Sequence, residues 1–328
     1  MTMKFYFLII IWFIFTETLC LQRYETRHHH HHQYLHTAEN RLFALNSHED
    51  NTTSGRVKGG IPARRNQFPF YVLIQQKNAP MRLVCSGSIL SSRWILTAAH
   101  CFYFTETKRI PPSRLQVKAG ALRLAESRPY YLDVQTNDVM QLVQHPQYYH
   151  RAKPFRLYND IGLIQLRGYL NLNNNAVKPI QLPYKNQKIS GDLIVAGFAG
   201  YGFRPVWPQL YFIETSMISR AECEHNISRS LIPRDMLDKV LCTMPAFGQS
   251  ACKGDSGGPV IYNEDTEYVI GVVSFMATQS CDNDYSNPHM HSNVRQHLDF
   301  IYSHVGDLER NFVWHNQAPK SSYVSDIC

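Results

Sequence analysis

Short apolar runs separated by turn residues dominate the chain from Phe68 onward. They are rich in β-branched and aromatic residues and have the length of single strands, a combination that predicts β-strands rather than helices. The strands expected on this basis cover residues 68–75, 81–90, 93–100, 115–120, 193–202 and 267–275.

Helical periodicity is clear at the C-terminal end of this pattern. Within residues 293–305, Val294, Leu298, Ile301 and Val305 recur at the spacing of one helical face. The strand-rich part of the chain shows little comparable periodicity. The pattern therefore predicts an all-β body closed by one C-terminal helix.

The N-terminus has a different pattern, in which Lys4 precedes the apolar run Phe5–Phe15 and polar residues follow. This run is far shorter than the roughly 20 residues that span a bilayer. Its order is that of a secretory signal cleaved near Thr18 or Cys20, with a retained signal anchor as the alternative. We therefore expect residues 1–20 to be a signal peptide, and the protein to be secreted into the extracellular space without stable membrane insertion.

Residues 21–56 are polar and contain the histidine-rich segment Arg27–His32. We interpret them as a flexible leader, because they show no sustained apolar period. A metal-binding tract and an expression tag are the alternative interpretations of the histidines. The residues after Val305 are also polar and give no structural prediction.

Composition and charge exclude some classes of function. The 328 residues are 44% hydrophobic and 18% charged, which is ordinary for a globular protein. The formal net charge of +7 is spread along the chain, so we interpret it as solvated surface and expect no nucleic acid partner. Asn51 and Asn226 lie in glycosylation sequons, which are compatible with secretion.

Three separated motifs carry residues that can act together in nucleophilic catalysis. "WILTAAHC" contains His100, "NDIGLIQL" contains Asp160, and the glycine-rich "GDSGGP" contains Ser256. A serine hydroxyl is a weak nucleophile until a histidine accepts its proton, and that histidine needs a carboxylate to orient it and stabilise its charge. Alone, the histidine could be a core residue and the aspartate an ordinary strand start, whereas the serine motif is specific.

With these motifs in the order His, Asp, Ser, the chain resembles the trypsin- and chymotrypsin-like serine proteases over residues 57–305. The resemblance implies two six-stranded antiparallel β-barrels with a C-terminal helix and an active site in the cleft between them. It makes His100 the general base and then acid, Asp160 its orienting partner and Ser256 the nucleophile. The backbone N–H groups of Gly254 and Ser256 would form the oxyanion hole, and Ser274 in "VVSF" matches the serine that supports the aspartate.

A secretory route implies that the eight cysteines are read as disulfides. The resemblance pairs Cys85–Cys101, Cys223–Cys242 and Cys252–Cys281. The first of these closes the loop that carries His100, and a loop of about 15 residues contributes about 3 kcal/mol in the chain-entropy model. Whether Cys20 survives signal removal and pairs with Cys328 stays open.

The segment "SGRVKGG" resembles the activation site of the family, although Lys58 replaces the usual second apolar residue. Cleavage after Arg56 would create an ammonium group at Val57. That group would compensate the charge of Asp255, a carboxylate that is costly to bury alone. Residues 21–56 would then be a propeptide; the alternative is that Arg56 is merely an exposed basic residue.

The resemblance also identifies a specificity pocket that contains Ser250, Ala251 and Ser274. Ser250 stands at its base, where trypsin-like enzymes carry an aspartate, so basic specificity is disfavoured. Met276 and His289 occupy the positions of two wall glycines and would narrow the pocket. A small or medium apolar side chain fits such a pocket best, and an acidic one fits if His289 points inward.

We therefore expect a secreted serine endopeptidase that acts on protein substrates, is activated by a separate trypsin-like protease and is controlled by protein inhibitors. Residues 306–328 would be a C-terminal extension. The alternative is a catalytically silent homologue that serves as an extracellular binding module, an interpretation that the altered pocket supports and the complete triad opposes. We expect no cofactor and no metal, because His289-Met290-His291 lacks a recognisable third ligand.

Overall fold

A computed structural model describes residues 60–152, 155–189, 191–198, 209–227, 234–247, 249–251, 254–276 and 288–306. The expected signal peptide, the leader and the C-terminal extension beyond Gly306 lie outside these residues. Among the described residues, no helix is long and apolar enough to cross a membrane.

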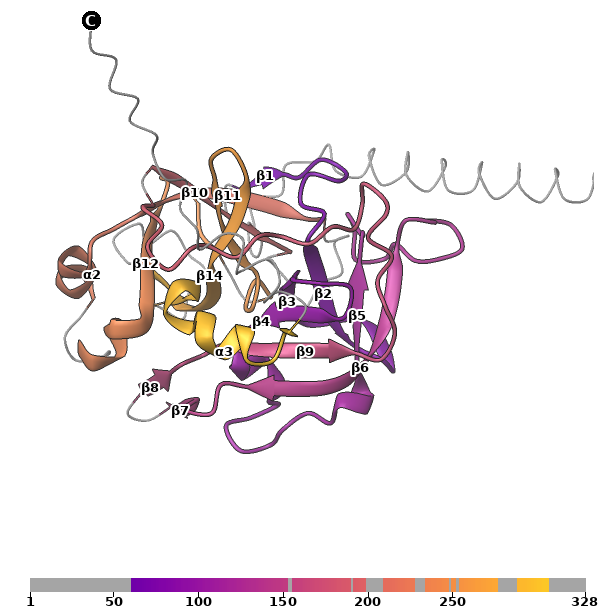
Figure 1. The fold of residues 1–328 in the computed structure, drawn as a ribbon, viewed down its shortest axis with the longest axis horizontal. Coiled ribbons are helices and arrows are strands. Elements are labelled where there is room, and N and C mark those ends of the chain that lie inside the picture. The colour runs from indigo at the N-terminus through magenta and orange to yellow at the C-terminus, as the bar shows by residue number, and fades with distance from the viewer. Residues whose placement is uncertain are drawn as a thin grey trace, which may run out of the picture. The chain divides into compact units, whose positions relative to one another are not determined.

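The first half of the described chain forms a closed barrel with the strand order β2-β3-β4-β9-β6-β5, drawn in purple and magenta in Figure 1. All of its strand pairs are antiparallel. Its strands are β2 (Tyr71–Gln76), β3 (Ala79–Ile89), β4 (Trp94–Thr97), β5 (Leu115–Ala119), β6 (Gln135–Gln144) and β9 (Gly162–Leu166).

The second barrel has the order β11-β10-β13-β14-β15-β12 and closes where β12 pairs with β11. The short strand β1 (Ile61–Pro62) adds to β11, and β7 (Tyr149–Ala152) and β8 (Phe155–Tyr158) form a separate hairpin. The two six-stranded antiparallel barrels that the resemblance implied are therefore confirmed. The strands of the second are β10 (Asp192–Gly197), β11 (Tyr211–Met217), β12 (Val240–Pro245), β13 (Pro259–Asn263), β14 (Glu267–Met276) and β15 (His289–Asn293).

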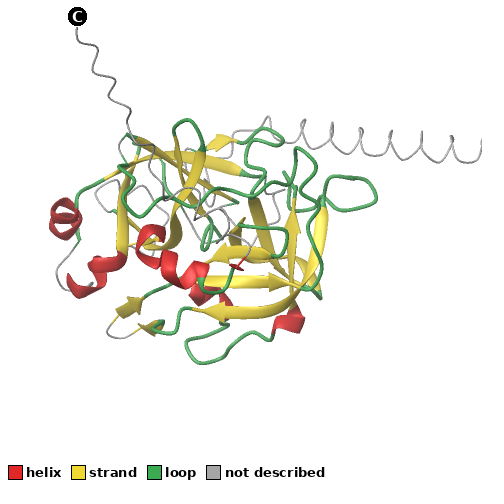
Figure 2. Ribbon diagram, viewed as in Figure 1, coloured by secondary structure: helices red, strands yellow, loops and turns green. Residues whose placement is uncertain are grey.

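The helices are short and lie at the ends of strands (Figure 2). The C-terminal helix begins as the 3-10 turn η4 (Val294–His297) and continues as α3 (Leu298–Tyr302), the yellow element in Figure 1. Helix α2 was not predicted. Its start is stabilised by a capping box between Ser219 and Glu222. The remaining helical turns are η1 (Ala99–Phe102), η2 (Pro112–Arg114) and η3 (Arg234–Lys239), and α2 spans Arg220–Asn226.

The strand that was expected to run to His100 ends three residues earlier. Strand β4 stops at Thr97, and the 3-10 turn η1 follows and contains His100. Ala98 and Ala99, between the end of the strand and His100, are apolar and buried, so their hydrophobicity alone does not distinguish a strand from a buried turn. The turn matters because it places His100 outside strand β4.

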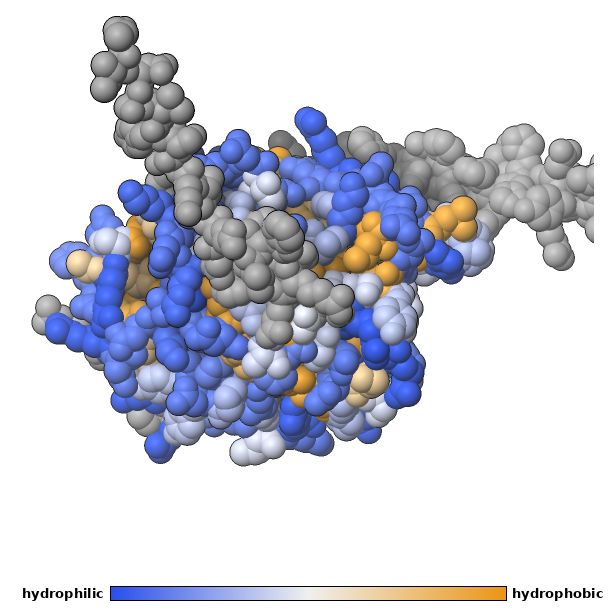
Figure 3. Space-filling model, in the orientation of Figure 1, coloured by the Kyte–Doolittle hydropathy of each residue, from blue (hydrophilic) through white to orange (hydrophobic). Residues whose placement is uncertain are grey.

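One continuous apolar core joins the first barrel to the C-terminal helix. Val294, Leu298, Ile301 and Val305, the helical face expected from the sequence, are all buried in the same cluster as strands of the first barrel. Burying one such side chain typically contributes about 1.5–3 kcal/mol. Outside this core, the face shown in Figure 3 is largely hydrophilic, with apolar side chains in small patches.

This packing predicts the effect of truncating the helix face. Ile301→Ala removes a fully buried side chain and should lower the free energy of unfolding by about 2–5 kcal/mol. Gln296→Ala, at an exposed position of the preceding turn, should change it by no more than about 0.5 kcal/mol. Denaturant unfolding of both variants measures the difference, and equal stabilities would show that the helix does not pack into the core.

Candidate active site

The register of the first barrel brings His100 and Asp160 together. Strands β4 and β9 pair antiparallel with Thr97 opposite Gly162, so the turn after β4 meets the residues that precede β9. His100 Nδ1 donates to Asp160 Oδ2 at 2.7 Å, and the His100 backbone N–H donates to Asp160 Oδ1 at 2.8 Å. Both carboxylate oxygens therefore hold the same histidine.

Two serines from the second barrel complete the surroundings of Asp160. Ser274 Oγ in β14 donates to Asp160 Oδ2 at 2.5 Å, as its expected supporting position requires. Ser292 Oγ in β15 donates to the Asp160 carbonyl oxygen at 2.6 Å. Sequence reasoning missed Ser292, because a serine in a strand has no motif that reveals its distant partner.

These contacts shift the pKa of both members of the pair. Burial alone would raise the pKa of Asp160, but the nearby charge of His100 and hydrogen bonds from His100 and Ser274 bring it below its ordinary value. Burial alone would lower the pKa of His100, but Asp160 raises it above its ordinary value through its charge and its hydrogen bond. With Nδ1–H committed to Asp160, Nε2 is the nitrogen of neutral His100 that can accept a proton.

Ser256 lies in a loop of the second barrel that docks against the first. A Cβ at Gly257, where φ is +80°, would overlap Thr97 Oγ1 and the Ser86 carbonyl oxygen, so only glycine allows this approach. The Gly257 N–H donates to the Val273 carbonyl at 2.8 Å, which anchors the loop to β14. The loop therefore touches the strand that ends beside His100.

No hydrogen bond joins Ser256 Oγ to His100 in the part of the chain that the structure describes. In proteins without bound substrate such contacts are often long, and they tighten when substrate binds. Gly254, two residues before the serine, has φ of +107°, a conformation that glycine adopts at little cost. Between them, Asp255 is fully buried against Gly197, where a Cβ would overlap its carboxylate.

Two residues that the structure describes at the base of the expected specificity pocket, Ser250 and His289, are uncharged. Ser250 Oγ donates to the Ala251 carbonyl at 3.0 Å and lies 3.3 Å from His289 Nε2. Burial lowers the pKa of His289 to about 4, so this imidazole is neutral at pH 7. Behind it, His291 Nε2 lies 3.0 Å from Thr243 Oγ1, and burial lowers its pKa to about 3.

The comparisons with known proteins agree on one family. The family model described as "Trypsin" matches residues 57–301. Trypsin-1 of Astacus astacus is 29% identical over 249 residues, which cover 75% of this chain and 98% of that protein. Serine protease SP24D of Anopheles gambiae is 31% identical over 225 residues, which cover 67% of this chain and 72% of that one.

A solved structure leads to the same conclusion. The structure described as neuropsin, a serine protease expressed in the limbic system of mouse brain, matches with a TM-score of 0.59 and 26% identity. The match covers 74% of this chain and 97% of that one. The chain belongs to the trypsin family of serine endopeptidases. Members of this family act on protein substrates, and this chain has their two-barrel fold.

Among the described residues, disulfide bonds brace this trypsin-family protease at two places. Cys85–Cys101 joins β3 to the turn that carries His100, and Cys223–Cys242 joins α2 to β12. The expected Cys252–Cys281 bond lies outside the described residues, as do Cys20 and Cys328.

The structure describes the other expected positions in part. Asn226 is exposed at the end of α2. Met276 is the last residue of β14, but its side chain is not among the described parts of the structure. Arg56, Val57 and Asn51 lie outside the described residues.

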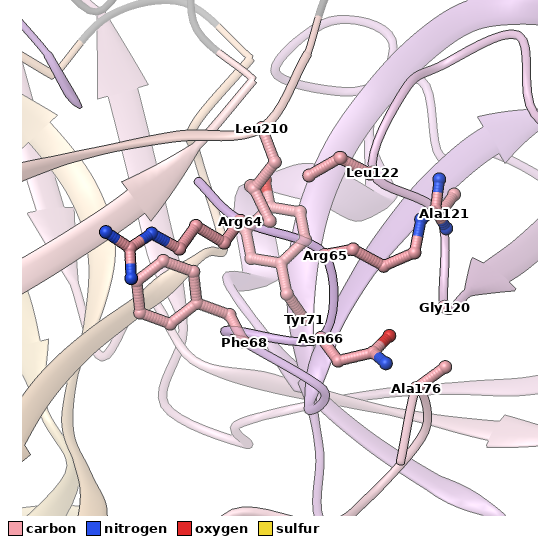
Figure 4. A pocket seen from close by; sticks show the side chains of 10 residues that line it. All are labelled: Arg64, Arg65, Asn66, Phe68, Tyr71, Gly120, Ala121, Leu122, Ala176 and Leu210. Carbon is pink, nitrogen blue, oxygen red and sulfur yellow. The ribbon is translucent and has the colours of Figure 1, made fainter. Parts of the chain in front are cut away.

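Two other features of this protease are a cluster of possible metal ligands around His100 and a small pocket away from the triad. The Cys85, His100 and Cys101 side chains converge closely enough for a metal ion, but the two sulfurs are joined to each other and offer no thiolate. A small pocket beside β2 is lined by Arg64, Arg65, Tyr71 and neighbouring residues (Figure 4), and it contains none of the triad.

The charge of Asp160 should control the titration of His100. In Asp160→Asn the Coulombic attraction to the imidazolium is lost, so the pKa of His100 should fall below that in the parent protein. Imidazole NMR signals followed through a pH titration, and assigned with His100→Gln, measure this shift. His289 should keep its pKa of about 4 in both proteins. An unchanged His100 pKa would contradict the assigned electrostatic cause.

Proposed function

We propose that this chain is a secreted serine endopeptidase, made as a zymogen, in which Ser256, His100 and Asp160 form the catalytic triad. The observation that supports this most is the hydrogen-bonded pair His100–Asp160 beside the loop of Ser256. A buried carboxylate that holds Nδ1–H leaves Nε2 as the base and stabilises the imidazolium that forms when it accepts a proton.

The steps of peptide hydrolysis follow from these positions. Ser256 Oγ attacks the scissile carbonyl carbon while its proton moves to His100 Nε2, and the resulting oxyanion accepts hydrogen bonds from the Gly254 and Ser256 backbone N–H groups. His100 then gives the proton to the leaving amine, which breaks the C–N bond and leaves an acyl-enzyme. Water repeats the sequence and releases the acid.

Activation would depend on Asp255. This carboxylate is completely buried next to the proposed nucleophile, and a positive charge placed beside a buried carboxylate stabilises its charged form. In this proposal, cleavage after Arg56 creates the ammonium group of Val57, which adds such a charge beside Asp255. In this proposal residues 1–20 direct secretion, residues 21–56 are the propeptide, and a separate trypsin-like protease makes the cut.

Covalent labelling tests the catalytic proposal. A fluorophosphonate probe should label the secreted protein after an added trypsin-like protease has cut after Arg56, because the probe needs the activated serine. The matched variant Ser256→Ala, cut in the same way, should remain unlabelled. The uncut protein incubated alone should gain neither the cut nor the label. Self-cleavage with accelerating activity would refute the separate activator, and a cut but unlabelled parent would refute the enzyme.

That last result would support the alternative proposal, a silent homologue that binds an extracellular partner through the same cleft. The observation in its favour is the pocket base, where buried His289 takes up space beside Ser250. If the chain is instead an active endopeptidase, protein inhibitors of serine proteases would bind to its cleaved, active form. The labelling experiment therefore separates the two functions.

Non-basic primary specificity is the second part of the proposal. An arginine or lysine side chain would meet the neutral pair Ser250 and His289, and burying its charge there without a carboxylate typically costs several kcal/mol. A small or medium apolar side chain carries no such cost. An acidic side chain would have to accept a hydrogen bond from the neutral His289 imidazole. Alternatively, the negative charge of the substrate would have to raise the pKa of His289 until the imidazole becomes protonated.

Matched peptides that differ only in the residue before the scissile bond test this specificity. With Arg, Phe, Leu, Ala and Glu compared, kcat/KM should be highest for Leu or Ala. Ser250→Asp should raise kcat/KM for Arg at least about tenfold, because about 1.4 kcal/mol of charge compensation gives that factor. His289→Gly and Met276→Gly should improve Phe. A parent enzyme that prefers Arg would refute the role assigned to Ser250.

A further inference from the structure

Ser86 in β3 lies at the centre of a group of hydrogen bonds that the proposed mechanism does not use. Its backbone N–H donates to the Ser256 carbonyl at 2.8 Å, and its Oγ donates to the Gly254 carbonyl at 2.9 Å. Its own carbonyl accepts a hydrogen bond from Thr97 Oγ1 at 2.8 Å. Ser86 has no exposed surface, so water does not replace these bonds.

Tyr71 in β2 fixes the direction of the Ser86 hydroxyl. The Tyr71 hydroxyl and Ser86 Oγ form a short hydrogen bond. Because the single proton of Ser86 Oγ goes to the Gly254 carbonyl, Tyr71 must be the donor. Burial first, and then the nearby charge of Asp255, raises the pKa of Tyr71 far above its ordinary value, so the hydroxyl stays protonated. A directed chain therefore runs from Tyr71 through Ser86 to Gly254.

The Tyr71 ring is itself held in place. It packs on the Phe198 ring with centroids 5.8 Å apart, and only 4% of Tyr71 is exposed. Tyr71 also lines the small pocket in Figure 4. The donor at the start of the chain thus has little freedom to turn away.

The two carbonyls bonded to Ser86 lie on either side of Asp255. The Gly254 carbonyl belongs to the peptide that joins residues 254 and 255, and the Ser256 carbonyl belongs to the peptide that joins residues 256 and 257. Holding the two carbonyls therefore fixes both of these peptide planes. Glycine at 254, with φ of +107°, would otherwise leave this loop unusually free to rotate. Hydrogen-bond donors that stabilise a transition state are effective only when they are already aimed.

We propose that Ser86, oriented by Tyr71, is a positioning residue for the oxyanion hole: it restrains the loop Gly254–Ser256 so that its two amides point at the developing oxyanion. The inference rests on the proposed function of this loop. Ser86 touches no substrate in this proposal and acts through the two backbone carbonyls. Its side chain therefore contributes to the transition state rather than to the binding of the substrate.

Ser86→Ala and Tyr71→Phe test the proposal in the cleaved enzyme, normalised by fluorophosphonate titration of active sites. Losing one oxyanion donor typically costs about 10²–10³ in rate. Ser86→Ala should loosen the Gly254 and Ser256 N–H donors without removing them, so kcat should fall about 10–100-fold while KM stays nearly unchanged. Tyr71→Phe should lose less. The double variant should equal Ser86→Ala, because Tyr71 acts only through Ser86.

A pair of inhibitors separates positioning from general damage. A peptide aldehyde forms a tetrahedral adduct whose oxygen occupies the oxyanion hole, whereas the matching peptide alcohol does not. Ser86→Ala should lower the affinity for the aldehyde by the same factor as kcat and leave the affinity for the alcohol unchanged. Two results would overturn the proposal: an equal loss of affinity for the aldehyde and the alcohol, or no change in kcat and in aldehyde affinity.

Ser88→Ala is the matched control. Ser88 lies in the same strand and is buried, but its hydroxyl has no hydrogen-bond partner among the described residues, so kcat and aldehyde affinity should stay at parent values. If Ser86→Ala does not fold, Tyr71→Phe must still show the loss that is specific to the aldehyde, and its absence there refutes the chain. A parent enzyme that takes no fluorophosphonate refutes the proposed function instead.

Discussion

The burial of the Asp160 carboxylate is the constraint on which the rest of the site depends. Only 3% of its surface is exposed, and a charge in such surroundings is tolerated only when neighbouring groups compensate it. One compensating residue, His100, comes from the first barrel, and another, Ser274, comes from the second. The barrels must therefore dock accurately for this charge to be stable, and the same docking assembles the site.

The loop of Ser256 obeys the same rule through its backbone. It belongs to the second barrel, yet two of its carbonyls are bonded to Ser86 of the first. On its other side Gly257 is bonded to Val273 of β14. A loop held from both barrels loses little further entropy when a substrate arrives, which is what a preorganised site requires. In the proposed mechanism, Asp160 and this loop thus make catalysis a property of the interface between the barrels.

The contrast between predicted and unpredicted residues follows from sequence distance. Strands such as β2 and β14 and the "GDSGGP" motif depend on local patterns, and sequence reasoning found them. Helix α2 also had a local signal, the capping box at Ser219, which was overlooked. Ser86 and Ser292 had none: their partners Gly254 and Asp160 lie 168 and 132 positions away. A polar residue in a strand shows its role only when the fold supplies the partner.

The two kinds of buried polar site in this protein differ in where their compensation comes from. Asp160 keeps its charge because hydrogen bonds from His100 and Ser274 of the same chain compensate it without any substrate. A carboxylate at the base of the specificity pocket would be compensated only while a basic substrate occupied it, and would be costly to bury in the empty enzyme. In the specificity pocket that we propose, the neutral pair of Ser250 and His289 avoids that cost. The base of the proposed pocket therefore does not depend on the charge of a substrate.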